Sequence, residues 1–282
     1  MKKLLSFGHG YSAQALVKLL PADWTVVSTT RKTEKFDLLE SQGVTPVQWP
    51  GSDLGDHINT ATHVLISAAP DADGDPVLRE WRDLIAARAD QFDWVGYLST
   101  TGVYGDHNGD WVDESAPLTP ATKRGQMRVS AEAEWRSLGL PLHIFRLAGI
   151  YGPGRGPFSK VRNGTARRII KSGQVFSRTH VDDIARVLWA SINRPNPGAA
   201  YNVCDNDPAP PQDVIEYAAE LLGLPIPPAE DFETAEMTPM ARSFYAESKK
   251  VKNDRIKDEL GVELLYPDYK SGLRALLAAE NG

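Results

Sequence analysis

The first thirty residues constrain the fold more than any other part of the chain. A short apolar run over residues 3–7 meets a glycine turn over residues 8–10, and residues 14–20 then carry apolar side chains at helical spacing. A second apolar run follows over residues 24–28. Strand, glycine turn, helix and strand in this order predict the β-α-β unit that opens a dinucleotide-binding fold.

The glycine turn predicts a site for a diphosphate. Gly8 lets the chain leave the strand sharply, and Gly10 has no Cβ, so that a diphosphate can approach the backbone. Ala13 is small enough for the helix to pack close to the strand. The first residues of the helix, Tyr11 and Ser12, would offer free N–H groups to the phosphates. A purely structural turn is the alternative interpretation, because glycine turns are common.

The end of the second strand indicates which cofactor is bound. A site for NAD usually has Asp or Glu there to bond the ribose 2′-hydroxyl. The residues at this point are Thr29, Thr30, Arg31 and Lys32. Cations and hydroxyls suit a 2′-phosphate, so the sequence predicts NADP(H), with NAD as the alternative. The other interpretation is an exposed basic turn that Glu34 and Asp37 neutralise.

Strands and helices alternate as far as about residue 150. Residues 62–69 form an apolar run that is typical of a strand buried on both faces. It ends in small residues, which would leave room for a nucleotide at the carboxyl edge of the sheet. These small residues are Ser67, Ala68 and Ala69. We predict an α/β protein with a Rossmann-type, doubly wound parallel sheet over residues 1–150. A smaller α/β substrate lobe over residues 151–282 would be interleaved with it.

The composition excludes several classes of function. The chain has 282 residues, and its net charge of −6 argues against nucleic acid as the main partner. No stretch approaches the roughly 18 apolar residues of a membrane helix, and a signal peptide is not expected. One cysteine, Cys204, allows no internal disulfide and favours the cytoplasm. The six histidines are scattered, so no metal site is predicted.

Four motifs follow one another along nearly the whole chain. They are the glycine turn, Ser-Thr-Thr-Gly-Val-Tyr-Gly at residues 99–105, Arg-Leu-Ala-Gly-Ile-Tyr-Gly-Pro-Gly at residues 146–154, and His-Val-Asp-Asp-Ile-Ala at residues 180–185. In this order they resemble the extended short-chain dehydrogenase/reductase family, also called the NAD-dependent epimerase/dehydratase family. The resemblance implies NAD(P) binding, and a second lobe that binds nucleotide sugars in ordinary members.

The same resemblance implies a catalytic set that is incomplete here. In the family, a Ser or Thr and a Tyr-x-x-x-Lys pair act on the substrate oxygen. Thr100 matches the hydroxyl residue, whereas Arg124 stands where the tyrosine belongs and Arg128 where the lysine belongs. Because arginine stays protonated, Arg124 cannot exchange a proton near pH 7. Arg128 can still present a positive charge to a ribose or phosphate. The chain therefore resembles the atypical extended members.

Two further features have alternative interpretations. Tyr104 and Tyr151 lie at the expected carboxyl edge and could replace the missing acid, but both belong to structural motifs of the family, which favours a packing role. Four cations lie in the polar, basic stretch over residues 158–172. They form either the solvated face of an amphipathic helix or a clamp for a phosphate of the substrate. They are Arg162, Arg167, Arg168 and Lys171.

Two functions of different classes stay open. The first is an NADP-dependent oxidoreductase or epimerase with an altered acid–base group, acting on an unidentified small molecule such as a nucleotide sugar. The second is a non-catalytic module that binds NADP(H) and reports its level to a partner protein. The hydroxyl of Thr100 favours the enzyme, and the missing tyrosine favours the module. Both a monomer and a homodimer are compatible with the sequence.

Overall fold

A parallel sheet of seven strands forms the centre of the protein, whose computed structural model describes residues 1–281. The strands lie in the order β3-β2-β1-β4-β5-β7-β11, and every neighbouring pair is parallel. Their bounds are β1 (Lys3–Phe7), β2 (Thr25–Thr30), β3 (Val44–Gln48), β4 (His63–Ile66), β5 (Trp94–Thr100), β7 (Leu142–Leu147) and β11 (Ala200–Val203). The strand order reverses between β1 and β4, which confirms the predicted doubly wound, Rossmann-type sheet.

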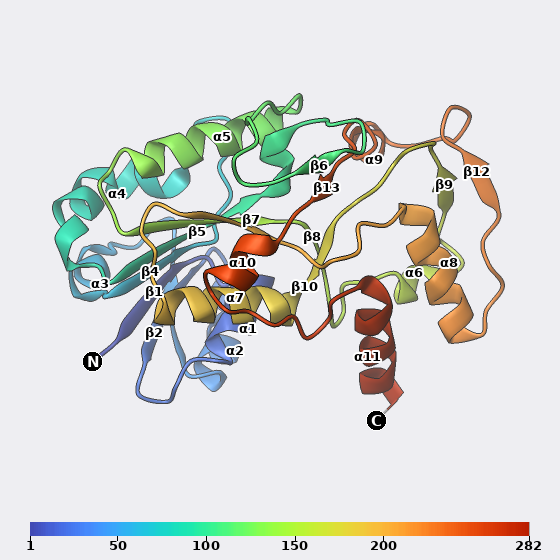
Figure 1. The fold of residues 1–282 in the computed structure, drawn as a ribbon. Helices are drawn as coiled ribbons and strands as arrows, with labels where there is room; N and C mark the ends of the chain where they lie inside the picture. Colours follow the sequence, from blue (N-terminus) through green and yellow to red (C-terminus); the bar gives the residue numbers. More distant parts are fainter. Residues whose placement is uncertain (282) are drawn as a thin grey trace.

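Helices cover both faces of this sheet (Figure 1). On one face lie α1 (Tyr11–Val17), α2 (Phe36–Ser41) and α7 (Val181–Asn193), and on the other lie α3 (Gly55–Thr60), α4 (Pro76–Ala87) and α5 (Lys123–Arg136). Successive residues of a strand point to opposite faces, so that Leu4 belongs to the first core and Leu5 to the second. Burial on both faces explains why the strands read as continuous apolar runs.

The chain returns to the main sheet after residue 150. Helix α7 packs beside α1, and β11 then adds the seventh strand next to β7. The helix layer formed by α1, α2 and α7 therefore includes residues from both sides of residue 150, and so does the sheet.

The second lobe is built from short strand pairs and three helices, at the right of Figure 1. β8 (Gly149–Tyr151) pairs with β10 (Arg178–His180), and β9 (Arg168–Ile170) pairs with β12 (Ala229–Asp231). The helices α6 (Phe158–Arg162), α8 (Pro211–Leu222) and α11 (Tyr269–Asn281) enclose a third core. A further pair, β6 (Trp111–Val112) with β13 (Lys250–Val251), ties the loop after β5 to the tail, which also carries α9 (Pro239–Ser243) and α10 (Asp254–Asp258).

The described helices are short. Across residues 1–281, none has both the length and the apolar composition that a membrane crossing requires.

Candidate functional site

The glycine turn is locked between the ends of three strands. Gly8 has a φ of +94°, and a Cβ there would stand 2.8 Å from the Ser67 hydroxyl. Its N–H donates to Thr29 Oγ1 at 2.8 Å, and Ser67 Oγ donates to its carbonyl at 2.9 Å. Ser67 N and Ala68 N both donate to the Phe7 carbonyl, at 3.0 and 2.9 Å. Only glycine fits this position, which lies where the strand order reverses.

The second glycine of the turn leaves a bare, open surface. Gly10 is exposed, and a Cβ built there would meet no atom within 4 Å. It precedes α1 without a side-chain cap, whereas Ser12 and Ala13 are buried beneath the turn. Ala69, at the end of β4, is exposed. An accessible backbone between small residues fits the diphosphate of a dinucleotide.

The carboxyl end of β2 divides its polar residues between structure and solvent. Thr29 is buried and is used by the Gly8 N–H, so it belongs to the turn itself. Thr30 is half-buried, and Arg31 and Lys32 are exposed. Lys32 lies 3.4 Å from Glu34 in an exposed ion pair, whereas Arg31 forms no ion pair with any residue in the range 1–281. Arg31 is thus the cation at this point that is free to bind an anion.

His9, inside the turn, was not among the expected site residues. Its ring is buried, with Nδ1 at 3.1 Å from Ser28 Oγ and Nε2 at 3.4 Å from Gln42 Oε1. Burial lowers the pKa of His9, so the ring is neutral near pH 7. The side chain anchors the turn to β2, and its place between two glycines is the sequence signal for this role.

Arg128 reaches the second half of β5, the strand that ends at Thr100. Its Nη1 donates to the Leu98 carbonyl at 2.7 Å and to the Tyr97 hydroxyl at 3.0 Å. The half-buried guanidinium keeps its Nε and Nη2 donors without a partner in the described part of the chain. Thr100 Oγ1 accepts the Gly102 N–H at 3.1 Å, which leaves its own O–H to donate.

Arg124 does not take part in this arrangement. Its side chain is exposed in the first turn of α5 and forms no hydrogen bond or ion pair with residues 1–281. Of Arg124 and Arg128, only Arg128 is hydrogen-bonded to β5 within residues 1–281.

Behind Thr100 lies a buried polar network that the sequence reasoning missed. Arg146 holds Glu132 through two bonds, Nη2 to Oε2 at 2.9 Å and Nε to Oε1 at 3.2 Å. Ser99 Oγ donates to Glu132 Oε1 at 2.6 Å. Arg146 Nη1 also donates to the Tyr104 hydroxyl at 2.9 Å, and this hydroxyl donates to Asn202 Oδ1 at 2.6 Å. The network joins α5 to β5, β7 and β11. The sequence feature that points to this network is the spacing of Arg128 and Glu132, which are four residues apart and so lie on the same face of α5.

The two tyrosines considered as replacement acids are both packing residues. Burial raises the pKa of Tyr104 to about 12. Its hydroxyl donates one hydrogen bond and accepts another, both within the network. The Tyr151 hydroxyl is buried and has no partner among residues 1–281, and burial raises its pKa as well. A Cβ on Gly272 would stand 2.0 Å from this hydroxyl, so Tyr151 packs closely against α11 in the core of the second lobe.

The four cations of the basic run all have partners within the protein. Each of its arginines pairs with a carboxylate, and the lysine donates to a carbonyl. The pairs are Arg162–Glu280, Arg167–Glu230, Arg168–Glu216 and Lys171 with the Tyr245 carbonyl. The run is not one helix face, because α6 ends at Arg162 and β9 begins at Arg168. This pairing argues against a preformed phosphate clamp.

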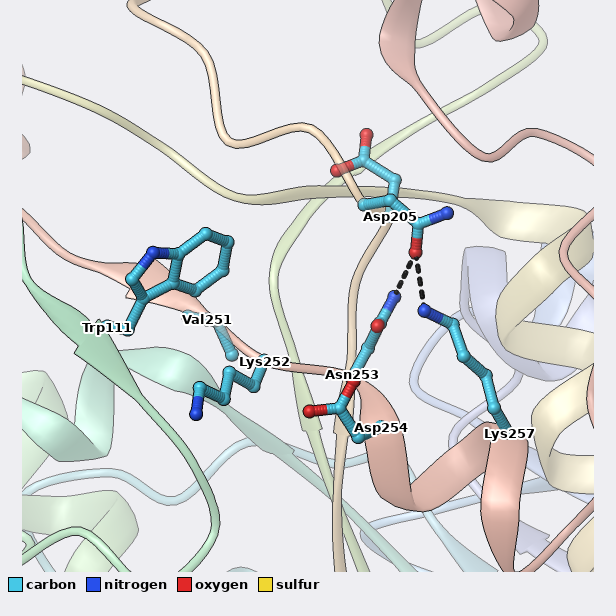
Figure 2. A pocket seen from close by; sticks show the side chains of 8 residues that line it. Trp111, Asp205, Val251, Lys252, Asn253, Asp254 and Lys257 are labelled. Atoms are coloured by element: carbon cyan, nitrogen blue, oxygen red, sulfur yellow. Dashed lines mark hydrogen bonds between the residues drawn. The ribbon is translucent and has the colours of Figure 1, made fainter.

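A cavity of about 280 Å³ lies beside β11 (Figure 2). Trp111 and Lys252 form one side, and Asn253 and Lys257 form the other. Lys257 Nζ and Asn253 Nδ2 both donate to Asn206 Oδ1, at 2.8 and 2.9 Å. Two strands, β5 and β7, separate β11 from β4. The cavity is therefore distinct from the glycine turn at the strand reversal, and it contains none of the expected site residues.

Comparisons with known proteins agree with this architecture. The chain is 61% identical to a functionally unknown conserved protein from Silicibacter pomeroyi, whose structure matches with a TM-score of 0.95 and with 99% of each chain covered. This chain belongs to the same family as that protein. It is also 28% identical over 283 residues to protein YeeZ of Escherichia coli K12, which covers 95% of this chain and 97% of the relative. No family model matches the sequence.

The fold is also that of NAD-dependent epimerases. UDP-glucuronic acid 4-epimerase from Bacillus cereus, solved in complex with UDP-glucuronic acid and NAD, is 18% identical. It matches with a TM-score of 0.79 over 99% of this chain and 98% of the epimerase. The resemblance to the epimerase/dehydratase family is thus confirmed at the level of fold. The placing of Arg124 and Arg128 at the family's Tyr and Lys positions stays a prediction.

Proposed function

We propose that this protein binds NADP(H) in the crevice between β1 and β4. The observation that carries the proposal is the glycine turn at the strand reversal, where Gly8 is held at positive φ and Gly10 leaves open space. The epimerase from Bacillus cereus, which has this fold, was solved with NAD. That neighbour supports a nicotinamide dinucleotide, and the choice of NADP rests on the end of β2.

Each part of the cofactor has residues that suit it. The diphosphate would lie on the turn formed by Gly8, Gly10, Tyr11, Ser12 and Ala13, and the nucleotide beside Ser67, Ala68 and Ala69. Thr30, Arg31 and Lys32 would hold the 2′-phosphate, because guanidinium binds phosphate through two parallel hydrogen bonds. Arg128 would donate its free Nε and Nη2 hydrogens to the ribose. When bound, the nicotinamide supplies hydride exchange.

On this basis we further propose an oxidoreductase or epimerase with a non-standard active site. Thr100 would donate its hydroxyl hydrogen to a substrate oxygen, and the fixed charge of Arg128 would stabilise negative charge that develops nearby. The substrate is a small molecule, with a nucleotide sugar as the candidate that the Bacillus cereus neighbour suggests.

A specific observation favours a second function, a non-catalytic NADP(H) sensor. The Tyr104 hydroxyl is committed to Asn202 and Arg146, and Arg124 is exposed without a partner in the described residues. Neither residue can exchange a proton with a ligand near pH 7. A protein without a proton donor can still bind the cofactor, and binding can alter the surface that a partner protein recognises.

Cofactor titrations test the binding proposal. Isothermal titration with NADPH and NADH should show binding of both to the unaltered protein, with NADPH the tighter ligand. Arg31→Asp should weaken NADPH binding by about tenfold or more, since a hydrogen bond to a charged group contributes ~1.5–3 kcal/mol. NADH binding should change far less. An equal loss for both would refute the 2′-phosphate assignment, and no binding of either would refute the proposal.

Turnover separates the enzyme from the sensor. NADPH absorbance would be followed with a panel of carbonyl compounds and nucleotide sugars. Activity that is lost in Thr100→Ala and retained in Thr100→Ser supports the enzyme. Undiminished cofactor affinity without turnover on any member of the panel supports the sensor.

A further inference from the structure

A tight turn of the second lobe lies against the first residue of α1. Gly152 and Arg155 close this turn with two backbone hydrogen bonds, each of 2.9 Å. The Tyr11 hydroxyl donates to the Pro153 carbonyl at 2.9 Å. Gly152 has a φ of +153°, and a Cβ there would stand 2.5 Å from the Tyr11 hydroxyl and 2.8 Å from Val181 Cγ1. The approach of the two segments therefore requires glycine.

This turn carries a cation to the edge of the glycine turn. The Arg155 guanidinium lies over the Tyr11 ring, 5.8 Å from its centroid, and Tyr11 directly follows Gly10. Such a cation–π contact orients the guanidinium while leaving its N–H groups free. Burial, followed by the charge of Asp182, raises the pKa of the Tyr11 hydroxyl, and the Asp182 carboxylate lies 3.6 Å from His180 Nδ1. Arg155 itself is exposed and forms no ion pair with any residue from 1 to 281.

The neighbouring arginines of the same lobe behave differently. Arg162, Arg167 and Arg168 each pair with a carboxylate of the lobe. In a chain with a net charge of −6, an arginine that is oriented by a ring but unpaired is available for an external anion. The anion that the proposed function brings to this place is the diphosphate, because it would lie on the turn that Tyr11 continues.

We propose that Arg155 completes the diphosphate site from the second lobe. The inference rests on the proposed function, since the ligand is the diphosphate of a nicotinamide dinucleotide at Gly8 and Gly10. A guanidinium binds two phosphate oxygens at once, so Arg155 would close the side of the site that the glycine turn leaves open. Bound cofactor would then join residues 152–155 to the glycine turn, and the second lobe to the sheet.

The proposal predicts a loss of affinity that does not depend on the 2′-phosphate. Arg155→Ala should weaken NADPH and NADH binding by the same factor, about tenfold, as measured by isothermal titration. Arg155→Lys should restore part of the affinity, because lysine keeps the charge but not the paired hydrogen bonds. Arg162→Ala is the matched control, because it removes an exposed arginine of the same lobe that pairs with Glu280, and both affinities should stay unchanged.

The outcomes distinguish the two proposals. If the unaltered protein binds both cofactors and Arg155→Ala binds them equally well, the role of Arg155 is refuted and the proposed function stands. A loss confined to NADPH would move Arg155 to the 2′-phosphate and also refute the inference. If the unaltered protein binds neither cofactor, the proposed function fails, and the inference fails with it. A thermal melt that matches the unaltered protein would confirm that Arg155→Ala is folded.

Discussion

The glycine turn and the network behind Thr100 lie at the same edge of the sheet, but they are built in opposite ways. At the turn, bonds to Thr29 and Ser67 hold the backbone in place, and Gly10 leaves a bare surface. In the network, the polar groups of Glu132 and Arg146 bond to each other and to neighbouring side chains, and both residues are buried. One half of this edge thus exposes backbone that could bind a ligand, as we propose, whereas the other half bonds its polar groups internally.

Removing the carboxylate of the network should have the largest effect. Glu132→Ala leaves the buried Arg146 guanidinium without its charged partner, which should lower the free energy of unfolding by about 3–5 kcal/mol. Urea denaturation would measure this change.

A second glutamate on the same helix provides the control. Glu134 pairs with Arg82 at the surface, where both side chains are more than a third exposed. Glu134→Ala should therefore cost less than about 1 kcal/mol. Equal losses for the two variants would show that the network is not a special source of stability.

The two glycines of the turn should respond differently to the same substitution. Gly8→Ala forces a side chain into a positive φ and against Ser67, which should cost about 1–3 kcal/mol of stability. Gly10→Ala meets no atom, so its stability cost should stay below about 1 kcal/mol. Its Cβ should nevertheless obstruct the diphosphate and weaken NADPH binding.

Thermal melts and cofactor titrations of both variants would test this difference. A Gly10→Ala protein that binds NADPH as tightly as the unaltered protein would contradict the diphosphate site, even if its melting temperature behaves as expected.

The stability that the network contributes should also depend on pH, and this is the smallest of the expected effects. Burial alone would raise the pKa of Glu132, but its hydrogen bonds with Arg146 and the charge of Arg146 bring it below the ordinary value of 4.5. A carboxyl with a lowered folded-state pKa stabilises the protein above the unfolded-state pKa, and this stability is lost as the pH falls through the folded-state value.

The matched comparison is the unaltered protein against Glu132→Gln. Their difference in unfolding free energy should be constant near pH 7 and shrink below about pH 4.5, by at most ~1.4 kcal/mol per pH unit. Urea denaturation at several pH values would measure it. A difference that stays constant down to pH 3 would contradict a charged Glu132 in the folded protein.

The local part of the fold was predictable because it depends on near neighbours. The glycine turn could be predicted from the sequence because the strand, the turn and the first helix occupy one short segment. The small residues after β4 were expected at the cofactor site, and the structure places Ser67 and Ala68 directly against the turn. Arg124 and Arg128 show the limit of such local prediction. Their spacing of four residues predicts one helix face, but Arg124 is exposed whereas Arg128 reaches β5.

By itself, the sequence determined the β-α-β opening and the doubly wound parallel sheet. Short-range patterns suffice for these, because turn chemistry and apolar periodicity act within a few residues. Only the tertiary structure decided that β11 returns to the sheet, that Glu132 faces Arg146, and that Arg155 lies over Tyr11. These contacts join segments far apart in the chain, and no local pattern records which of many polar residues will meet once the sheet has formed.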